Sequence, residues 1–165
     1  MPYRYCPLCA HPLAITLIEN SQRLACSAGD CGFVHWDNPL PVVAALVEYQ
    51  GKIILARNAK WPRGIFSVVT GFLEQQESPA QAIVREVKEE LNLEGLVTHF
   101  IGHYPFAEMN QIILAFALQA SGTLKTNHEL AETQLLSLDQ LQAYDFSPLY
   151  ITTAIVKDWL AQRPI

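Results

Sequence analysis

Three glutamates, Glu86, Glu89 and Glu90, fall within five consecutive residues of the stretch REVKEE. If this stretch is helical, Glu86 and Glu90 repel each other across one turn, and the dipole near the C-terminal end of the helix disfavours anions. A divalent cation bound by several carboxylates would turn that repulsion into attraction, and hard oxygen ligands suit magnesium or manganese. The alternative is a solvated acidic face, because exposed glutamates are good helix formers.

The residues before the glutamates predict the helix that carries them. Ser78, Pro79 and Gln81 supply an N-cap, a proline at the first helical position and a capping-box partner. With about 100° between successive residues, the apolar side chains and the glutamates fall on different faces. We therefore expect a helix from Pro79 with a charged face and a packed stripe made of Ala80, Val84, Val87 and Leu91.

The stretch from residue 71 to residue 93 resembles the signature of the Nudix hydrolases, G-x5-E-x7-R-E-U-x-E-E-x-G-U, where U is aliphatic. The matching positions are Gly71, Glu77, Arg85, Glu86, Val87, Glu89, Glu90 and Leu93. Asn92 stands where the family has glycine, and asparagine is the residue that best replaces glycine in the left-handed conformation that closes a helix. The resemblance implies an α/β fold, the Nudix α/β/α sandwich with a mixed sheet.

The resemblance also implies roles for these residues. Glu86, Glu89 and Glu90 would hold magnesium or manganese, and one carboxylate would take a proton from the attacking water. Arg85 would reach Glu77 and orient the carboxylates rather than touch the substrate. Gly71 would allow a tight backbone turn. Which glutamate acts as the base is left open, because this role differs among Nudix enzymes.

All four cysteines lie in the first 31 residues, as Cys6-Pro-Leu-Cys9 and Cys26-Ser-Ala-Gly-Asp-Cys31. Two closely spaced pairs suit tetrahedral zinc, with one hairpin turn supplying each pair. Two disulfides are the alternative, but no secretory signal indicates an oxidising compartment. We therefore predict a zinc ribbon in residues 1–36 with a structural zinc ion, followed by a Nudix hydrolase domain in residues 37–165.

A ribbon followed by this signature narrows the resemblance to NADH pyrophosphatases and to FAD or ADP-ribose pyrophosphatases. The segment HELAE, residues 128–132, is similar to a K-E-L-L-E segment of these relatives, which makes Glu129 a candidate fourth magnesium ligand; the alternative is an exposed loop glutamate. Glu132 is a weaker candidate for a base or a ligand. Phe106 stands where the relatives carry the tryptophan of an SQPW-type motif. It could stack on a nucleobase or plug into the core. Arg57 could neutralise a phosphate or be surface charge.

These features predict hydrolysis of the diphosphate in a nucleoside diphosphate linked to another group, releasing AMP. ADP-ribose or FAD is favoured, and NADH is less favoured because most of the SQPW-type motif is missing. A nucleoside triphosphate pyrophosphohydrolase and a non-catalytic zinc-ribbon binding module are the alternatives. A Nudix-type isomerase of isopentenyl diphosphate would want a cysteine in the main domain, and the sequence has none after residue 31.

Around the predicted helix, apolar runs predict strands at 41–49, 52–57, 66–73, 96–104 and 112–119, with a loop at 105–108. Ser137 opens a short helix, and Ser147-Pro148 is a cap signal for a helix to Gln162. On that last helix, four residues are expected in the core: Leu149, Val156, Trp159 and Leu160.

The overall charge demands no particular partner. A net charge of −5 and a pI near 5.5 argue against a nucleic-acid binder held by a basic surface. The N-terminus MPYRYCPLC has no apolar signal region, and no run of about 18 apolar residues could span a membrane. We expect a cytoplasmic protein that binds a small nucleotide and no membrane, and a homodimer is left open.

Overall fold

The computed structural model describes residues 3–163, and the chain divides into two compact units, residues 1–38 and 39–165. Each is described by itself. The smaller unit is a three-stranded antiparallel sheet of β1 (Leu13–Ile18), β2 (Ser21–Cys26) and β3 (Val34–His35), in the order β1-β2-β3. Glu19 and Asn20 join β1 to β2 with positive φ at both positions, as a two-residue hairpin turn requires.

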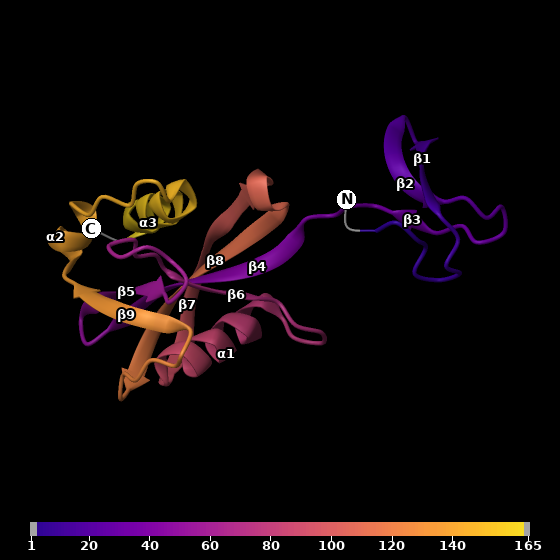
Figure 1. Ribbon diagram of the computed structural model, residues 1–165. Coiled ribbons are helices and arrows are strands. Elements are labelled where there is room, and N and C mark those ends of the chain that lie inside the picture. The colour runs from indigo at the N-terminus through magenta and orange to yellow at the C-terminus, as the bar shows by residue number, and fades with distance from the viewer. Residues whose placement is uncertain (1–2, 164–165) are drawn as a thin grey trace. The chain divides into compact units, whose positions relative to one another are not determined.

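The larger unit is built on a six-stranded mixed sheet (Figure 1). Its strands are β4 (Leu40–Tyr49), β5 (Lys52–Asn58), β6 (Val69–Phe72), β7 (Leu93–Phe106), β8 (Gln111–Gly122) and β9 (Leu130–Leu136). The order is β7-β8-β4-β5-β9. Strand β4 pairs in parallel with β8, while its other edge pairs with β6 over residues 42–45 and with β5 over residues 47–49.

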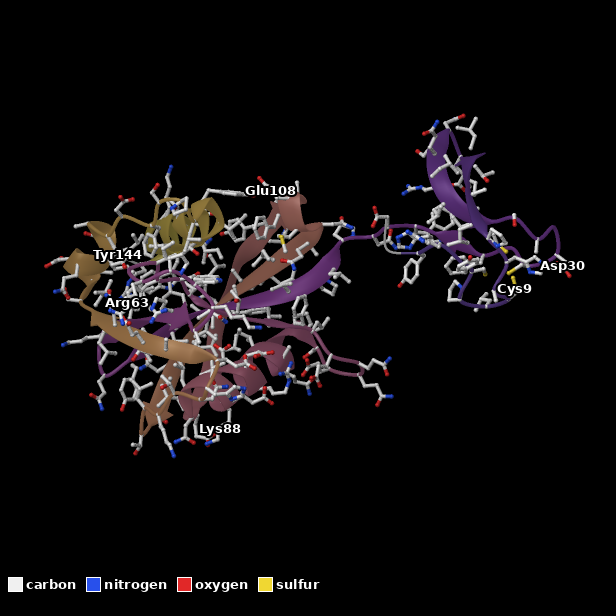
Figure 2. All side chains as sticks on the ribbon, in the orientation of Figure 1. Cys9, Asp30, Arg63, Lys88, Glu108 and Tyr144 are labelled. Carbon is white, nitrogen blue, oxygen red and sulfur yellow. The ribbon has the colours of Figure 1, made fainter. Side chains whose placement is uncertain are left out.

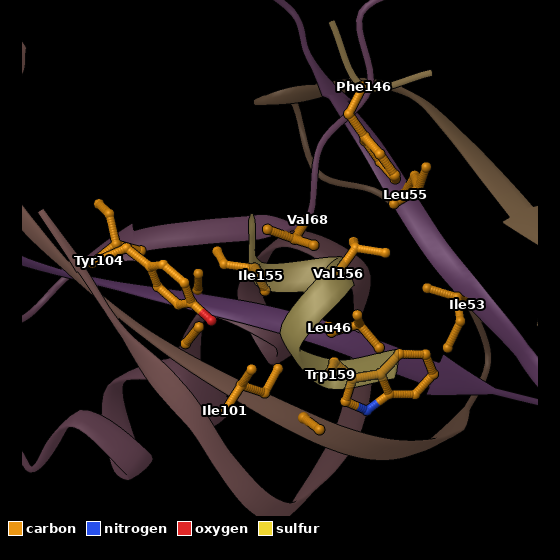
Figure 3. Packing of buried hydrophobic residues seen from close by; sticks show 14 of the residues in the cluster. Leu46, Ile53, Leu55, Val68, Ile101, Tyr104, Phe146, Ile155, Val156 and Trp159 are labelled. Atoms are coloured by element: carbon orange, nitrogen blue, oxygen red, sulfur yellow. The ribbon is translucent and has the colours of Figure 1, made fainter. Parts of the chain in front are cut away.

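Helices α1 (Pro79–Leu91) and α3 (Tyr150–Gln162) lie on opposite sides of this sheet (Figure 1). The side chains of β4 alternate between two cores, as a pleated strand requires. Val42, Ala44 and Leu46 join the cluster with α3, which Figure 3 shows around Trp159 and Ile155. Neighbouring positions on β4 join the cluster under α1: Val43, Ala45 and Val47. The predicted α/β/α sandwich is therefore confirmed.

The local signals around α1 behave as expected. Ser78 caps the helix, and it forms a reciprocal capping box with Gln81. At the other end, Asn92 adopts the left-handed conformation with φ 57° and ψ 26°, and its backbone N–H donates to Lys88 O. The exchange of glycine for asparagine is therefore compatible with the helix end. Ser137 likewise caps the short helix α2 (Leu138–Gln142).

Two expectations for the C-terminal half are wrong, and one strand was missed. Ser147 does not cap α3, which begins at Tyr150 with Leu149 at the N-cap position and no side-chain cap. The Ser147 backbone N–H donates to the Asp145 carboxylate. Residues 105–106 belong to β7, and the turn after them is the 3₁₀ segment η1 (Ala107–Met109). Strand β9 was not predicted, since only its pairing with β5 distinguishes it from a loop.

The core prediction for α3 is confirmed in part. Val156 and Trp159 are buried, and Leu160 is half-buried against the same cluster. Leu149 is half-buried as well, but it lines the cavity described next. No helix in residues 3–163 is long and apolar enough to cross a membrane.

Candidate functional site

A cavity of about 640 Å³ opens beside the charged face of α1. Its walls come from β4, β6, α1, the β7–β8 turn, the segment before β9 and the start of α3. The acidic side chains that line it are Glu74, Glu86, Glu89, Glu90 and Glu129. The structure thus brings the three glutamates of the signature helix and the downstream candidate Glu129 to one cavity.

Arg85 donates hydrogen bonds to three glutamates beside the cavity. Its Nε and Nη2 donate to both carboxylate oxygens of Glu77, at 3.1 and 2.8 Å. Its Nη1 donates to Glu86 Oε1 at 2.9 Å and to Glu89 Oε2 at 3.1 Å, and its Nη2 also reaches the Phe72 carbonyl. The planar guanidinium therefore orients three carboxylates at once. One of these contacts, with Glu77, was predicted from the sequence, and the other two were not.

Glu77 closes the loop that precedes α1. Its Oε1 accepts a hydrogen bond from the Glu74 backbone N–H at 2.7 Å as well as the bond from Arg85. The Arg85 guanidinium, followed by the Glu74 N–H, lowers the pKa of Glu77 below its ordinary value. Glu77 therefore stays ionised and anchors Arg85, and it does not line the cavity.

Glu90 is the buried member of the acidic set, with an exposed fraction of only 5%. Burial, followed by the negative charges of Glu86, Glu129 and Glu89, raises the pKa of Glu90 to about 8. Burial also raises the pKa of Glu86, although Arg85 opposes this shift. Carboxylates held together in this way resist ionisation unless a cation joins them, so the donor set fits a divalent metal ion.

The carboxylates are not drawn tightly together around one point. Within residues 3–163, the four cysteines form the only group of three or more metal-ligating side chains whose ligand atoms all lie within 4.8 Å of one another. Arg85 occupies one oxygen of Glu86 and one of Glu89. The second oxygen of each of these two carboxylates accepts no hydrogen bond from Arg85, so a cation can be bound while Arg85 keeps its contacts.

Gly71 does not sit in a tight turn, contrary to expectation. It pairs with Val43 inside β6, and the side chain of Glu86 lies against its Cα. The missing side chain, rather than a special backbone conformation, is what the site requires at this position.

Arg57 does not line the cavity. Its side chain is buried, with Nη2 donating to Glu132 Oε1 at 2.8 Å and Nη1 donating to the Trp61 carbonyl at 2.9 Å. Glu132 lies opposite Arg57 in the β5–β9 pairing, so this ion pair joins neighbouring strands. The geometry gives no support to a direct phosphate contact by Arg57 or to Glu132 as a base.

Phe106 lines the cavity together with residues of α3. Its half-buried ring packs edge-to-face on Tyr150, with centroids 5.9 Å apart and an interplanar angle of 82°. The Tyr150 hydroxyl donates to Glu108, which Figure 2 shows at the turn between β7 and β8. Phe106 is therefore both packed and accessible from the cavity, which is compatible with either role considered for it.

Sequence reasoning missed several cavity residues, including Trp61, Asn58, Asn127, Tyr150 and Thr152. None belongs to the signature. Trp61 carried one usable signal, since a tryptophan in a loop between strands is unusual for solvated surface. The others come together only through the fold.

The cysteines form a separate cluster in the smaller unit, with Sγ atoms 3.6 Å apart for Cys6 and Cys31 and 3.4 Å apart for Cys9 and Cys26. All four are free thiols, so the structure contains none of the disulfides considered above. Four thiolates at about 2.3 Å from a central zinc would stand about 3.8 Å from one another. Backbone N–H groups of Leu8 and Ala28 also point at Cys6 and Cys26 Sγ. The cluster fits a tetrahedral zinc ion.

Comparisons with known proteins agree with this geometry. The family model described as "NUDIX domain" matches residues 38–154. A protein described as "NAD-capped RNA hydrolase NudC" from Vibrio atlanticus (strain LGP32) is 32% identical over 140 residues, covering 84% of this chain and 51% of that protein. The Vibrio vulnificus (strain CMCP6) protein of the same description is 31% identical over 140 residues. The chain thus spans about half the length of the curated relatives it matches.

Solved structures show the same fold. A NUDIX hydrolase from Nitrosomonas europaea superposes with a TM-score of 0.79 at 21% identity, over 98% of this chain and 95% of that one. The E. coli ORF135 protein superposes with a TM-score of 0.60 at 31% identity, over 75% of this chain and 90% of that one.

Proposed function

Because this chain belongs to the NUDIX domain family, we propose that it hydrolyses the diphosphate of a nucleoside diphosphate linked to another group, releasing AMP. The observation that carries the proposal is the set of four glutamates, Glu86, Glu89, Glu90 and Glu129, on the wall of one cavity large enough for a nucleotide. A merely solvated acidic face would not bury one of these carboxylates.

In this reaction the charged side chains of the site have different roles. Glu86, Glu89, Glu90 and Glu129 would hold magnesium or manganese, whose chemistry in such a site is neutralisation of diphosphate charge and activation of water. One of these carboxylates accepts the proton as the water oxygen attacks phosphorus. The bond from that phosphorus to the bridging oxygen breaks, leaving AMP and a phosphorylated remainder. Arg85 and Glu77 keep the carboxylates oriented throughout.

The four cysteines would bind a structural zinc ion. The smaller unit has few buried apolar residues, with Cys6 and Ala25 the buried hydrophobic positions in residues 3–38. A sheet this small needs a further source of stability, and a metal supplies it. Because thiolates would fill all four coordination positions of this zinc ion, it would take no part in the reaction at the acidic cavity.

The choice of substrate rests on two observations that point in different directions. Phe106 replaces the tryptophan of the SQPW-type motif, which favours ADP-ribose or FAD over NADH. The relatives are described as NAD-capped RNA hydrolases, which favours the NAD cap at the end of an RNA. A net charge of −5 favours a free nucleotide over a capped RNA as the substrate, because proteins bind RNA through clustered basic residues. An NAD-capped RNA is the second candidate.

A substrate panel tests the proposal. The protein is incubated with magnesium and ADP-ribose, FAD, NADH, NAD-capped RNA or nucleoside triphosphates, and the products are separated by chromatography. AMP from one of the first three supports the proposal. Cleavage of the capped RNA alone supports the second candidate. Monophosphate and pyrophosphate from triphosphates alone would replace it with a triphosphate pyrophosphohydrolase, and no cleavage by a folded, zinc-containing protein would favour a binding module.

A further inference from the structure

Trp61 presents an aromatic side chain to the cavity. It is 37% exposed and lines the wall next to Asn58, and both residues also border a smaller hollow of about 40 Å³ with Ser67 and Glu90. Tryptophan left accessible beside a buried carboxylate loses the burial that usually stabilises it. Its planar face is, however, well suited to stacking on a planar ligand.

Several hydrogen bonds hold the loop that carries Trp61. The Asn58 side chain accepts a hydrogen bond from Lys60 N at 2.9 Å, and the Asn58 carbonyl accepts one from Trp61 N at 2.9 Å. A third hydrogen bond joins this loop to the segment before β9: Ala59 N donates to the Glu129 carbonyl at 2.7 Å. Residues 58–61 are therefore hydrogen-bonded to the segment that carries Glu129, a candidate metal ligand.

Arg57 also holds this loop. Its Nη1 donates to the Trp61 carbonyl, while its Nη2 pairs with Glu132. Burying a guanidinium is costly unless it is paired, and the Arg57 guanidinium forms an ion pair with Glu132 of the neighbouring strand. The second arm of the fork then fixes the backbone at the point where the tryptophan side chain leaves it.

We propose that Trp61 stacks on the planar ring of the bound nucleotide, and that Arg57 is a positioning residue that holds Trp61 for this contact. The inference rests on the proposed function, since it requires the cavity to bind a nucleotide. It replaces the phosphate role considered for Arg57 with one that acts on the ring through Trp61. Stacking of a base on an aromatic side chain contributes to affinity whatever the base, because every base has a π-face.

Three ligands separate ring binding from phosphate binding: AMP and nicotinamide mononucleotide, which carry a planar ring, and ribose 5-phosphate, which lacks one. Their dissociation constants are measured by calorimetry on the full chain with magnesium. Trp61→Ala should weaken AMP, nicotinamide mononucleotide or both by about 10-fold and leave ribose 5-phosphate within about 2-fold. Trp61→Phe, the matched control that keeps a ring, should lose much less. Unchanged binding of both ring ligands to Trp61→Ala would overturn the stacking role.

Arg57 is tested in the same assay. Arg57→Met should weaken the ring ligands as Trp61→Ala does, and it should add nothing in the double variant, because the two residues act as one unit. If Arg57→Met does not fold by circular dichroism, Arg57→Lys keeps the charge beside Glu132 but lacks the arm that reaches the Trp61 carbonyl. Equal weakening of ribose 5-phosphate, or full additivity in the double variant, would contradict the positioning role.

The outcomes also distinguish this inference from the proposed function. A wild-type protein that neither binds these nucleotides nor cleaves the panel would refute both. A wild-type protein that binds and cleaves, with Trp61→Ala unchanged in binding, refutes the inference alone.

Discussion

A Cβ atom built on Gly71 would lie 1.9 Å from Cδ of Glu86 and 2.1 Å from its Oε1. Such a distance is far inside van der Waals contact, so any side chain at residue 71 must displace the Glu86 carboxyl group. The Glu86 carboxyl group can lie against strand β6 only because this strand position has no side chain.

Gly71→Ala should therefore damage activity more than stability. The backbone at Gly71 needs no positive φ, and the displaced atoms belong to the flexible end of a glutamate. We expect turnover to fall by about 10²-fold, comparable to loss of a group engaged in proton transfer, with a small change in melting temperature. The measurements are steady-state turnover and thermal unfolding. Gly29→Ala, at a position with open space around it, is the control; equal turnover in both variants would contradict the steric argument.

Removing one carboxylate of the acidic set should stop catalysis without unfolding the chain. Glu86→Gln or Glu90→Gln should lower turnover by about 10²-fold or more, because each removes a metal ligand or base. Stability of the metal-free protein should hold or rise, since the folded chain no longer has to accommodate either a repulsive charge or a bound proton at that position. Glu94→Gln, at an exposed residue paired with Lys88, is the matched control and should keep wild-type turnover. Wild-type rates for Glu86→Gln under limiting magnesium would show that the assigned role is wrong.

The metal-free protein should lose stability as the pH rises. The pKa of Glu90 is about 8 in the folded protein and near 4.5 when unfolded, so below about pH 4.5 both states are protonated and no penalty exists. Between these values the unfolded state releases the proton first, and unfolding becomes progressively easier. Thermal melts from pH 5 to pH 8.5 should show a fall of at least about 2–4 °C, the shift expected for about 1 kcal/mol.

Two comparisons check that this fall comes from Glu90. In Glu90→Gln the decline should be much shallower, and in the wild-type protein added magnesium should raise the melting temperature more at pH 8 than at pH 6. A decline of equal size in Glu90→Gln would assign the effect to other groups.

The cysteine cluster should carry one zinc ion per chain. Elemental analysis after reducing purification should find it, and Cys9→Ser should lower the zinc content and make residues 3–38 susceptible to limited proteolysis. The larger unit should keep its own melting transition, because its core contains no cysteine. A metal-free protein containing two disulfides would end the zinc assignment.

Much of the site could be predicted because its determinants lie close together in the sequence. The capping box of Ser78 and Gln81, the left-handed Asn92 and the contact between Arg85 and Glu77 each involve residues within one or two helical turns or the adjoining loop. Local hydrogen bonds of this kind depend on neighbouring residue types, so a pattern of residues is enough to specify them. The cysteine spacing is informative for the same reason.

Only the tertiary structure decided what depends on distant residues. Arg57 meets Glu132 across 75 positions of sequence, which takes its guanidinium away from the cavity. Glu90 is buried because the segment before β9 returns to α1, where Asn127 N donates to the Glu90 carbonyl. Gly71 is required because a strand and a helix meet there. Burial and charge depend on which surfaces the folded chain brings together, and a residue's own neighbours in sequence carry no information about that.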